Sequence, residues 1–255
     1  MSAMMDLGKA FTDQEVVALY RHRPPYPRAV FGALASLIVE PHTVLDAGCG
    51  TGALARGLVG AATRVDAVDP SSAMLAAGRA RPGGADPRIH WQLGRAEDAE
   101  LRGPYGLITC GASLHWMHND VVLPRFRDAL ASGARLAIVD TEARREDDDV
   151  REAVLTVIKR YSPIHDHVET SEMVDALVAH SRLALEGQLR TPPVPFEQSV
   201  DEYLGFLGST SSLSRATLGS RAADLDRDLR DVFARNQVER IRYEVIGFVA
   251  WGRPT

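Results

Sequence analysis

The residues best suited to chemistry form a glycine-rich turn behind a short apolar segment. In the stretch Asp46-Ala47-Gly48-Cys49-Gly50-Thr51-Gly52, glycines recur at alternate positions. Glycine reaches positive φ at no steric cost and, without a Cβ atom, lets a ligand approach the backbone closely. The spacing is GxGxG, which differs from the GxGxxG fingerprint of dinucleotide-binding proteins. A glycine turn alone is weak evidence, but an acid directly ahead of it makes this segment a candidate ligand-binding loop.

A second acid, Asp69, ends the next apolar run along the chain, which passes through Val68. A carboxylate at this place can accept hydrogen bonds from both hydroxyls of a ribose, and it therefore selects a ribose without a phosphate group. The alternative for Asp46 and Asp69 is a structural role, because aspartate commonly caps helices and turns. The joint placement of the two acids favours nucleoside binding.

The elements that must position these residues alternate between strand and helix. Strands that alternate with helices form parallel sheets with helices on both faces, and ligands bind at the carboxyl ends of such strands where the strand order reverses. The sequence therefore predicts an α/β fold whose first strand carries the glycine turn. The predicted strands of this repeat are 43–47, 64–69, 88–93, 105–109 and 134–139.

The flanking segments are predicted to be mainly helical. Thr12-Asp13-Gln14-Glu15 fits a capping box for a first helix, and Pro27 suits the start of a second. Later segments read as helices at 147–161, 170–181 and 200–236, an interrupted strand at 182–198, and a last strand at 238–251. We predict one domain over 1–255, with a core of about 40–140 and 182–255 and lid elements of about 10–38 and 141–181, because inserts over a rigid sheet usually carry specificity.

Composition excludes several classes of protein. The 255 residues carry a formal net charge of −5, which disfavours a nucleic-acid partner. Cys49 and Cys110 cannot form a disulfide scaffold, the first residues do not form a signal peptide, and no segment has the roughly 20 apolar residues that span a membrane. We predict a cytoplasmic monomer or homodimer that acts on a small molecule without membrane contact.

The turn and its neighbours resemble class I S-adenosylmethionine-dependent methyltransferases. Val44–Gly52 is similar to the glycine-rich motif of the family, Val68-Asp69-Pro70-Ser71 with Met74 to its ribose-binding segment, and Gly94-Arg95-Ala96-Glu97 to its adenine-contacting turn. Tyr20 with Arg23-Pro24-Pro25-Tyr26-Pro27, and Ser113-Leu114-His115-Trp116, resemble the branch that includes trans-aconitate methyltransferases. The resemblance covers residues 20–140. It implies a Rossmann-like, seven-stranded, mainly parallel sheet with helices on both faces, plus N-terminal helices and a helical insertion after the fifth strand as a lid.

The resemblance also implies S-adenosylmethionine as cofactor and S-adenosylhomocysteine as product. The backbone of Gly48, Cys49 and Gly50 would lie beside the methionine moiety. Asp46 would order that region or bind the amino group, which the Cys110 backbone would also face. Two further residues, Tyr20 and Arg23, would cover the cofactor and meet its carboxylate, although a surface role is open for Arg23.

The same resemblance assigns residues to the adenosine end. Asp69 would hold the ribose, Pro70 and Met74 would pack near the adenine, and Ala96 with Glu97 would read its polar edge. These assignments carry over from matching motifs and do not follow from spacing alone.

The chemistry left to the protein is modest, because the cofactor is already an activated electrophile. His115 is the candidate general base, and its alternative is a histidine that bonds a backbone carbonyl or shapes the pocket. His118 and Asp120 read as helix-start residues. His165 and His167 lack a third ligand for a metal site, so no metal is predicted.

The predicted function is methyl transfer to a small molecule, with an oxygen acceptor (a carboxylate or a hydroxyl) slightly favoured over nitrogen or carbon. Tyr161, Tyr203 and Phe206 are possible acceptor contacts, with core packing as the alternative for each. Two other functions remain open: a catalytically silent S-adenosylmethionine-binding module, and a methyltransferase for tRNA or protein. A nicotinamide dehydrogenase would share the sheet and the acid, but the chain lacks the GxGxxG pattern.

Overall fold

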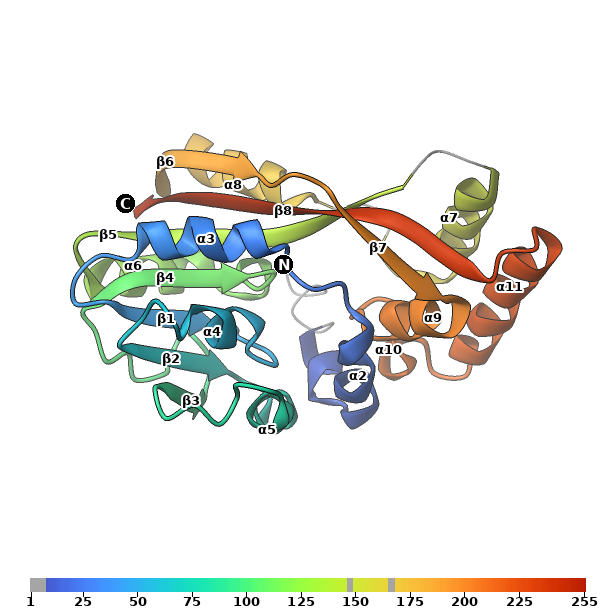
Figure 1. The fold of residues 1–255 in the computed structure, drawn as a ribbon, viewed down its shortest axis with the longest axis horizontal. Helices are drawn as coiled ribbons and strands as arrows, with labels where there is room; N and C mark the ends of the chain where they lie inside the picture. The colour runs from blue at the N-terminus through green and yellow to red at the C-terminus, as the bar shows by residue number, and fades with distance from the viewer. Residues whose placement is uncertain (1–7, 146–148, 165–167) are drawn as a thin grey trace. The chain divides into compact units, whose positions relative to one another are not determined.

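The computed structural model describes residues 8–145, 149–164 and 168–255 (Figure 1). The chain divides into two compact units. The first, the sheet unit, comprises Tyr26–Glu142, Val168–Pro192 and Ile246–Thr255. The second, the helical unit, comprises Met1–Pro25, Ala143–His167 and Pro193–Val245. The predicted lid segments are divided between them, and a lid function for these segments stays a prediction.

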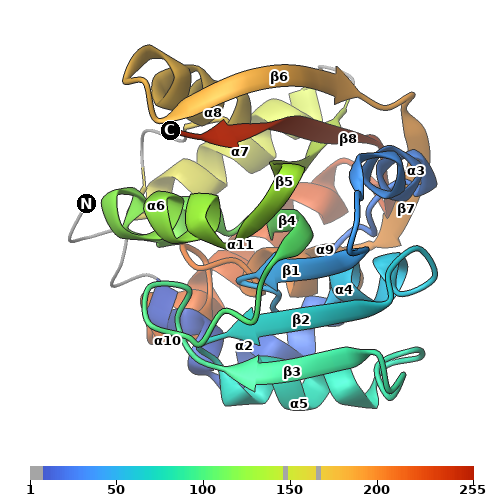
Figure 2. The same cartoon turned by 90° about the vertical axis from the view of Figure 1, so that its left-hand side faces the viewer.

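The sheet has the strand order β3-β2-β1-β4-β5-β8-β6, and β7 pairs with β8 outside this path (Figure 2). Pairing is parallel from β3 through β5, whereas β6 and β7 are antiparallel to β8. The predicted Rossmann-like α/β fold is therefore confirmed. Strand order reverses between β1 and β4, which is where ligands bind in such sheets. The strands are β1 Thr43–Ala47, β2 Arg64–Asp69, β3 Ile89–Leu93, β4 Tyr105–Gly111, β5 Leu130–Arg144, β6 Leu183–Arg190, β7 Val194–Ser199 and β8 Arg240–Pro254.

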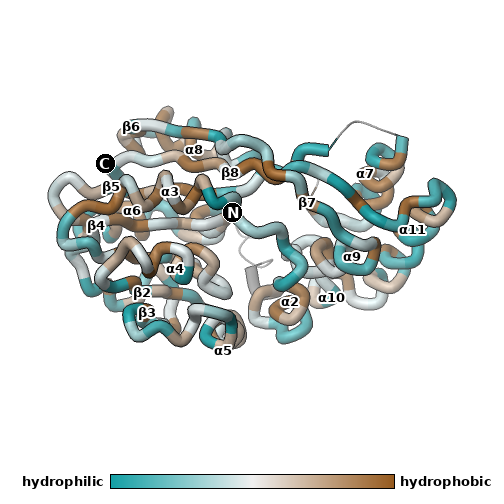
Figure 3. The backbone as a smooth tube through the Cα atoms, in the orientation of Figure 1, coloured by the Kyte–Doolittle hydropathy of each residue, from teal (hydrophilic) through white to brown (hydrophobic). Residues whose placement is uncertain are grey.

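Helices cover both faces of the sheet unit. Neighbouring strand residues alternate between two apolar clusters: Val44 and Leu107 join one, and Leu45 and Ile108 join the other. Strands buried on both faces read as continuous apolar runs, which is why the sequence reveals them clearly; Figure 3 shows this hydrophobic character along β4 and β5. One face is covered by α3 Arg28–Leu37, α4 Ala53–Leu58 and α5 Ser72–Ala80, and the other by α6 Asn119–Ala129 and α8 Thr170–Ala179.

The helical unit has an apolar core of its own. Phe233 and Leu229 are at its centre, and Tyr161, Tyr203 and Phe206 pack with them, so the core alternative for these three aromatics is confirmed. Besides β7 and the first part of β8, the elements of this unit are short 3-10 helices at Gly8–Thr12 and Tyr20–His22, α2 Gln14–Leu19, α7 Asp149–Tyr161, α9 Val200–Gly208, α10 Arg215–Leu218 and α11 Arg221–Arg235.

The predicted helix starts are correct to within a few residues. The N-cap of α2 is Asp13, whose side chain accepts from the amides of Glu15 and Val16 at 2.7 and 3.4 Å. The capping box beginning at Thr12 is therefore wrong by one residue, because the nearer carboxylate of Asp13 takes the amides of the first turn. Pro27 is the N-cap of α3, and α7 begins at Asp149, while Asp147 and Asp148 lie outside the described residues.

Candidate functional site

The glycine turn lies at the carboxyl end of β1, beside the reversal of strand order. Gly48, Gly50 and Gly52 all have positive φ, of 68°, 53° and 69°. The amides of Gly48 and Cys49 both donate to the carbonyl of Val68 in β2, at 2.8 and 3.0 Å. These bonds hold the turn against the neighbouring strand. The left-handed backbone predicted for this loop is confirmed at all three glycines.

At two of these glycines, side chains from elsewhere in the chain occupy the space that a Cβ atom would take. A Cβ on Gly48 would lie 2.5 Å from the Cβ of Ser113 and 3.1 Å from Met117 Cε. A Cβ on Gly52 would lie 2.3 Å from Cη2 of Trp91. Larger residues at either position would therefore displace side chains that close the turn. The sequence predicted glycines here for the approach of a ligand, and the structure adds this second reason.

Asp69 lies at the end of β2 and holds the turn with its carboxylate. Its Oδ2 accepts from the Gly50 amide and its Oδ1 from the Ser71 amide, both at 2.8 Å. Burial raises the pKa of Asp69, while these two backbone hydrogen bonds lower it. A carboxylate offers about four acceptor sites, so about two remain beyond the backbone bonds. The residue is 8% exposed, and its remaining acceptor sites suit the two donating hydroxyls of a ribose.

Asp46 is 1% exposed and acts as a remote cap of α4. Its Oδ2 accepts from the Ala55 amide at 3.0 Å and its Oδ1 from the Thr109 hydroxyl at 3.1 Å. The N-cap of α4 is Gly52, which has no side chain, so Asp46 satisfies an amide that would otherwise lack a partner. Burial raises the pKa of Asp46 to about 7. Asp46 is predicted either to order the glycine turn or to bind the amino group of the cofactor. The contacts with Ala55 and Thr109 correspond to the first of these roles.

Beside the predicted ribose site lies one exposed apolar residue that the sequence analysis did not single out. Leu93, the last residue of β3, is paired in register with Asp69 and is 61% exposed. Pro70, the residue that follows Asp69, is exposed at the surface. Met74, by contrast, is 1% exposed and lies in the protein interior. Leu93 and Pro70 are therefore apolar groups at the surface beside the acid. The signal for Leu93 was its place at the end of the neighbouring strand.

Ala96 and Glu97, predicted to read the adenine edge, contact α6. Ala96 is buried, and its carbonyl accepts from Nε of Arg125 at 3.2 Å. Glu97 accepts from the His118 amide at 3.0 Å and pairs with Arg95 at 3.1 Å. His118 is the N-cap of α6, and its side chain makes no capping hydrogen bond. The Glu97 carboxylate therefore supplies an acceptor and a negative charge at the start of this helix. An adenine contact for Ala96 and Glu97 stays a prediction.

The loop after β4 carries His115 to the same edge of the sheet. Ser113 Oγ donates to the carbonyl of Ala47 at 2.7 Å, and the Ala112 amide donates to the Val139 carbonyl at 2.8 Å. These bonds connect the loop to the end of β1 and to Val139 within β5. His115 is half-buried in a 3-10 turn, Leu114–Trp116, with its ring 4.6 Å from that of Trp116. Its role as a base stays a prediction.

The two cysteines are neutral thiols. Burial raises the pKa of Cys49 and of Cys110, and the negative charge of Asp46 acts in the same direction on both. The backbone of Cys110 pairs in register with Ile138 of β5. Neither thiol has the lowered pKa of a nucleophile, so any contribution of these residues comes from their backbone.

Tyr20 and Arg23 belong to the helical unit. The Arg23 guanidinium lies 4.1 Å from the centre of the Tyr20 ring and donates to the hydroxyl and the carbonyl of Ser209 at 3.0 and 2.9 Å. Arg23 therefore joins the N-terminal segment to the end of α9. A contact of Tyr20 or Arg23 with the cofactor stays a prediction.

The remaining polar candidates fall into two groups. His118 caps α6 and Asp120 lies in its first turn, where it pairs with Arg182 at 2.8 Å, so their prediction as helix-start residues is confirmed. His165 and His167 lie outside the described residues. Within the described part of the chain, no group of three or more potential ligands could hold a metal ion.

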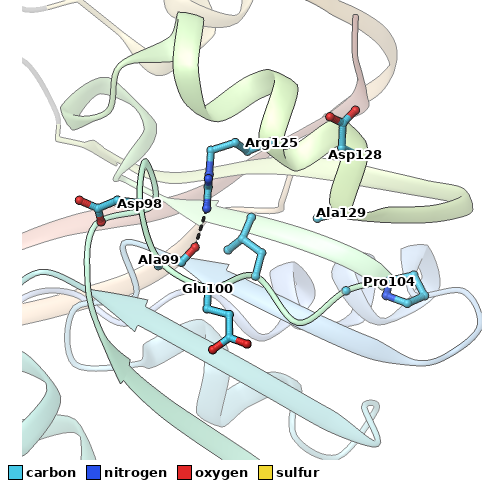
Figure 4. Close-up of a pocket in the computed structure, with 9 residues that line it drawn as sticks. Asp98, Ala99, Glu100, Pro104, Arg125, Asp128 and Ala129 are labelled. Carbon is cyan, nitrogen blue, oxygen red and sulfur yellow. Dashed lines mark hydrogen bonds between the residues drawn. The ribbon is translucent and has the colours of Figure 1, made fainter.

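A surface hollow lies at the start of β4 and shares no residue with the predicted cofactor site (Figure 4). Arg125 crosses it to the carbonyl of Ala99, and the carboxylates of Asp98, Glu100 and Asp128 surround it. Because the amino ends of the strands do not form the binding edge of such sheets, we do not assign the reaction to this hollow.

Comparison with known proteins decides the class of the site. Residues 44–133, from β1 into β5, match the family described as methyltransferase domain. This segment is therefore identified as a methyltransferase domain. A protein assigned as a type II methyltransferase from Anaeromyxobacter dehalogenans is 27% identical, with a TM-score of 0.62 over 91% of this chain and 97% of that one.

Other relatives are more distant. A methyltransferase from Geobacter sulfurreducens, solved with S-adenosyl-L-homocysteine, has a TM-score of 0.51 at 17% identity, over 92% of this chain and 93% of that one, and shows the fold alone. The malonyl-[acyl-carrier protein] O-methyltransferase of Anoxybacillus flavithermus is 38% identical over 88 residues. That match spans 33% of this chain and 33% of the relative.

The cofactor of this domain class is S-adenosylmethionine, and the residues present fit it. Asp69 offers spare acceptors for a ribose diol, the glycine turn has the left-handed backbone of the family motif, and Pro70 with Leu93 exposes apolar surface beside the acid.

Among the described residues, no helix combines the length and apolar character needed to cross a membrane.

Proposed function

We propose that this protein transfers a methyl group from S-adenosylmethionine to a small-molecule acceptor, with oxygen, in a carboxylate or a hydroxyl, as the favoured acceptor atom. The observation that carries the proposal is the carboxylate of Asp69 at the end of β2. It is tied to the glycine turn through Gly50 and keeps acceptor capacity beside β1, next to which the strand order reverses. A dehydrogenase would need a different glycine pattern at this place.

The preference for oxygen has two supports. A curated relative is an O-methyltransferase, matched over a third of its length. The segments Tyr20–Pro27 and Ser113–Trp116 resemble the trans-aconitate branch, whose acceptor is a carboxylate. Both supports point to an oxygen acceptor.

The residues of this chain have the task of orientation. The bound cofactor supplies an activated methyl group on a sulfonium, so the protein needs to hold the acceptor in line and exclude water. Orientation contributes up to roughly 7–11 kcal/mol in well-aligned cases. Asp69 fixes the ribose, and Asp46 fixes the turn through Ala55 and Thr109.

His115 is the proposed base for an acceptor that carries a proton. It follows β4 on a loop that Ser113 connects to the end of β1. A positioned base adds about a hundredfold to ten-thousandfold to a rate. A hydroxyl acceptor would need this proton transfer, whereas a carboxylate acceptor would not, so the effect of His115→Ala on turnover distinguishes the two.

The binding test is titration calorimetry with S-adenosylhomocysteine. Asp69→Ala is expected to weaken binding by about 1.5–3 kcal/mol, the range for hydrogen bonds to a charged group. Asp86→Ala is the control, since Asp86 is a surface aspartate ahead of the amino end of β3 that pairs with Arg88 at 2.8 Å and lies away from the glycine turn in sequence. Unchanged affinity in Asp69→Ala would show that the ribose lies elsewhere.

The activity test follows transfer of a labelled methyl group to panels of carboxylic acids, alcohols, amines, tRNA and protein. Labelled methyl groups in the acids or alcohols would support the proposal. Labelled methyl groups in tRNA or protein would show that the acceptor is a macromolecule. A protein that binds S-adenosylhomocysteine tightly but methylates nothing in these panels would instead be a silent binding module.

A further inference from the structure

Tyr26 places a hydroxyl group at the carboxyl end of β4. A Cβ atom on Gly111, the last residue of β4, would lie 2.8 Å from Oη of Tyr26 and 2.7 Å from Cδ1 of Leu54. A larger residue than glycine would therefore displace the hydroxyl. Leu54 lies in the first turn of α4, directly after the glycine turn. The hydroxyl of Tyr26 thus lies where the end of β4 meets the start of α4.

The ring that carries this hydroxyl is held firmly. It packs edge-to-face on Phe31 of α3, with ring centres 6.4 Å apart and planes at 87°. Phe31 in turn fills the space over Gly57 of α4, where a Cβ would lie 2.0 Å from its Cε1. Pro27 favours an extended backbone at Tyr26. A polar group on so constrained a ring is pre-organised for a ligand.

Strand order determines which part of the cofactor is near Tyr26. Asp69 ends β2 on one side of β1, and Gly111 ends β4 on the other side. If the ribose is held at Asp69, the rest of the molecule extends across the end of β1 toward β4. The amino-acid end of S-adenosylmethionine, with its carboxylate, is then the part nearest to Tyr26.

We infer that the Tyr26 hydroxyl donates a hydrogen bond to the carboxylate of the methionine moiety. The inference rests on the proposed cofactor binding and adds a residue to it. A phenol donates readily to an anionic oxygen, and such charge-assisted bonds are stronger than neutral ones. Tyr26 belongs to the same unit as Asp69, whereas Tyr20 and Arg23 belong to the helical unit. The contact is therefore complete within the sheet unit.

The test compares two ligands by calorimetry in the wild type and in Tyr26→Phe. S-adenosylhomocysteine has the amino-acid end, and 5′-methylthioadenosine has the adenosine and the sulfur without it. Tyr26→Phe is expected to raise the Kd for S-adenosylhomocysteine about tenfold and to leave the Kd for methylthioadenosine unchanged. Asp69→Ala should weaken both ligands, because both contain the ribose.

Tyr105→Phe is the matched control, since it removes a hydroxyl at the opposite end of β4, where it donates to Asp66 at 2.7 Å. It should change neither ligand's Kd. Gly111→Ala should reproduce the selective loss of Tyr26→Phe by displacing the hydroxyl. Equal losses for both ligands, or no loss for either, in a folded Tyr26→Phe protein would overturn the inference. Failure of both ligands to bind the wild type would instead refute the proposed cofactor site.

Discussion

The two units of this protein differ in how their apolar residues are distributed. The sheet unit buries strands on both faces, and every predicted cofactor residue except Tyr20 and Arg23 belongs to it. The helical unit buries one side of its helices and pairs the charges of the other, as in α11, where Arg227 contacts Asp224 at 2.8 Å. The comparison suggests a division of work: a rigid sheet binds a shared cofactor, and a separate helical region is free to vary with the acceptor.

The largest expected effect comes from opening a cavity in each core separately. Phe126→Ala in the sheet unit and Phe233→Ala in the helical unit each remove a side chain that is at most 1% exposed, at an expected loss of about 3–5 kcal/mol. We expect Phe126→Ala to abolish binding of S-adenosylhomocysteine and Phe233→Ala to preserve it. Hydrogen exchange should show the loss of protection confined to the unit that carries the change.

The division of work would be refuted if Phe233→Ala removed cofactor binding as completely as Phe126→Ala while the sheet unit kept its protection against exchange. Binding would then depend on residues of the helical unit, and Tyr20 and Arg23 would be the first to test.

A smaller effect is expected at the buried acid of the turn. The pKa of Asp46 is raised to about 7 by burial, above its ordinary value of 3.8. A raised folded pKa means that the contribution of Asp46 to stability is present below pH 4 and is lost as pH rises toward 7. Asp46→Asn stays neutral, so the stability of the wild type relative to the variant should fall between pH 4 and pH 7.

Urea unfolding of both proteins across this range measures the difference. Asparagine keeps an amide oxygen that can accept from the Ala55 amide, so the substitution is expected to leave this capping bond in place. A difference that stays constant from pH 4 to pH 8 would show that Asp46 titrates at its ordinary value.

The smallest effect is expected on the charged face of the helical unit. Arg230 pairs with Asp201 at 2.7 Å and with Asp226 at 2.8 Å, but its side chain is 47% exposed. Exposed ion pairs contribute about 0–1 kcal/mol, so Arg230→Ala should change the free energy of unfolding by less than about 1 kcal/mol. A larger loss of unfolding free energy in urea, one that persists at high salt, would mean that the Arg230 side chain contributes through packing as well as through its ion pairs.

Local patterns were enough to predict the central strands. The bounds of β1 and β2 agree with the predicted 43–47 and 64–69, because both are continuous apolar runs that end at turns. β5 is longer than the predicted 134–139. Its start at Leu130 lies outside the apolar run and is paired in register with Tyr105 of β4.

Contacts between distant residues could not be predicted in this way. The capping of Ala55 by Asp46 links positions across the glycine turn, and Trp91 fills the space beside Gly52 from a strand much later in the chain. Both depend on how β1, β3 and α4 pack. The same reasoning applies to Tyr26 and Gly111, which come together only when the N-terminal segment and the end of β4 are both in place.

The position of β8 has a consequence for how the protein is made. Residues 246–254, near the end of the chain, form a strand between β5 and β6. During synthesis, β6 therefore leaves the ribosome before the strand with which it pairs, and this edge of β6 stays unpaired until residues 246–254 have emerged. A polypeptide that stops short of residue 246 would present that bare edge to other chains, so we expect such fragments of this protein to aggregate.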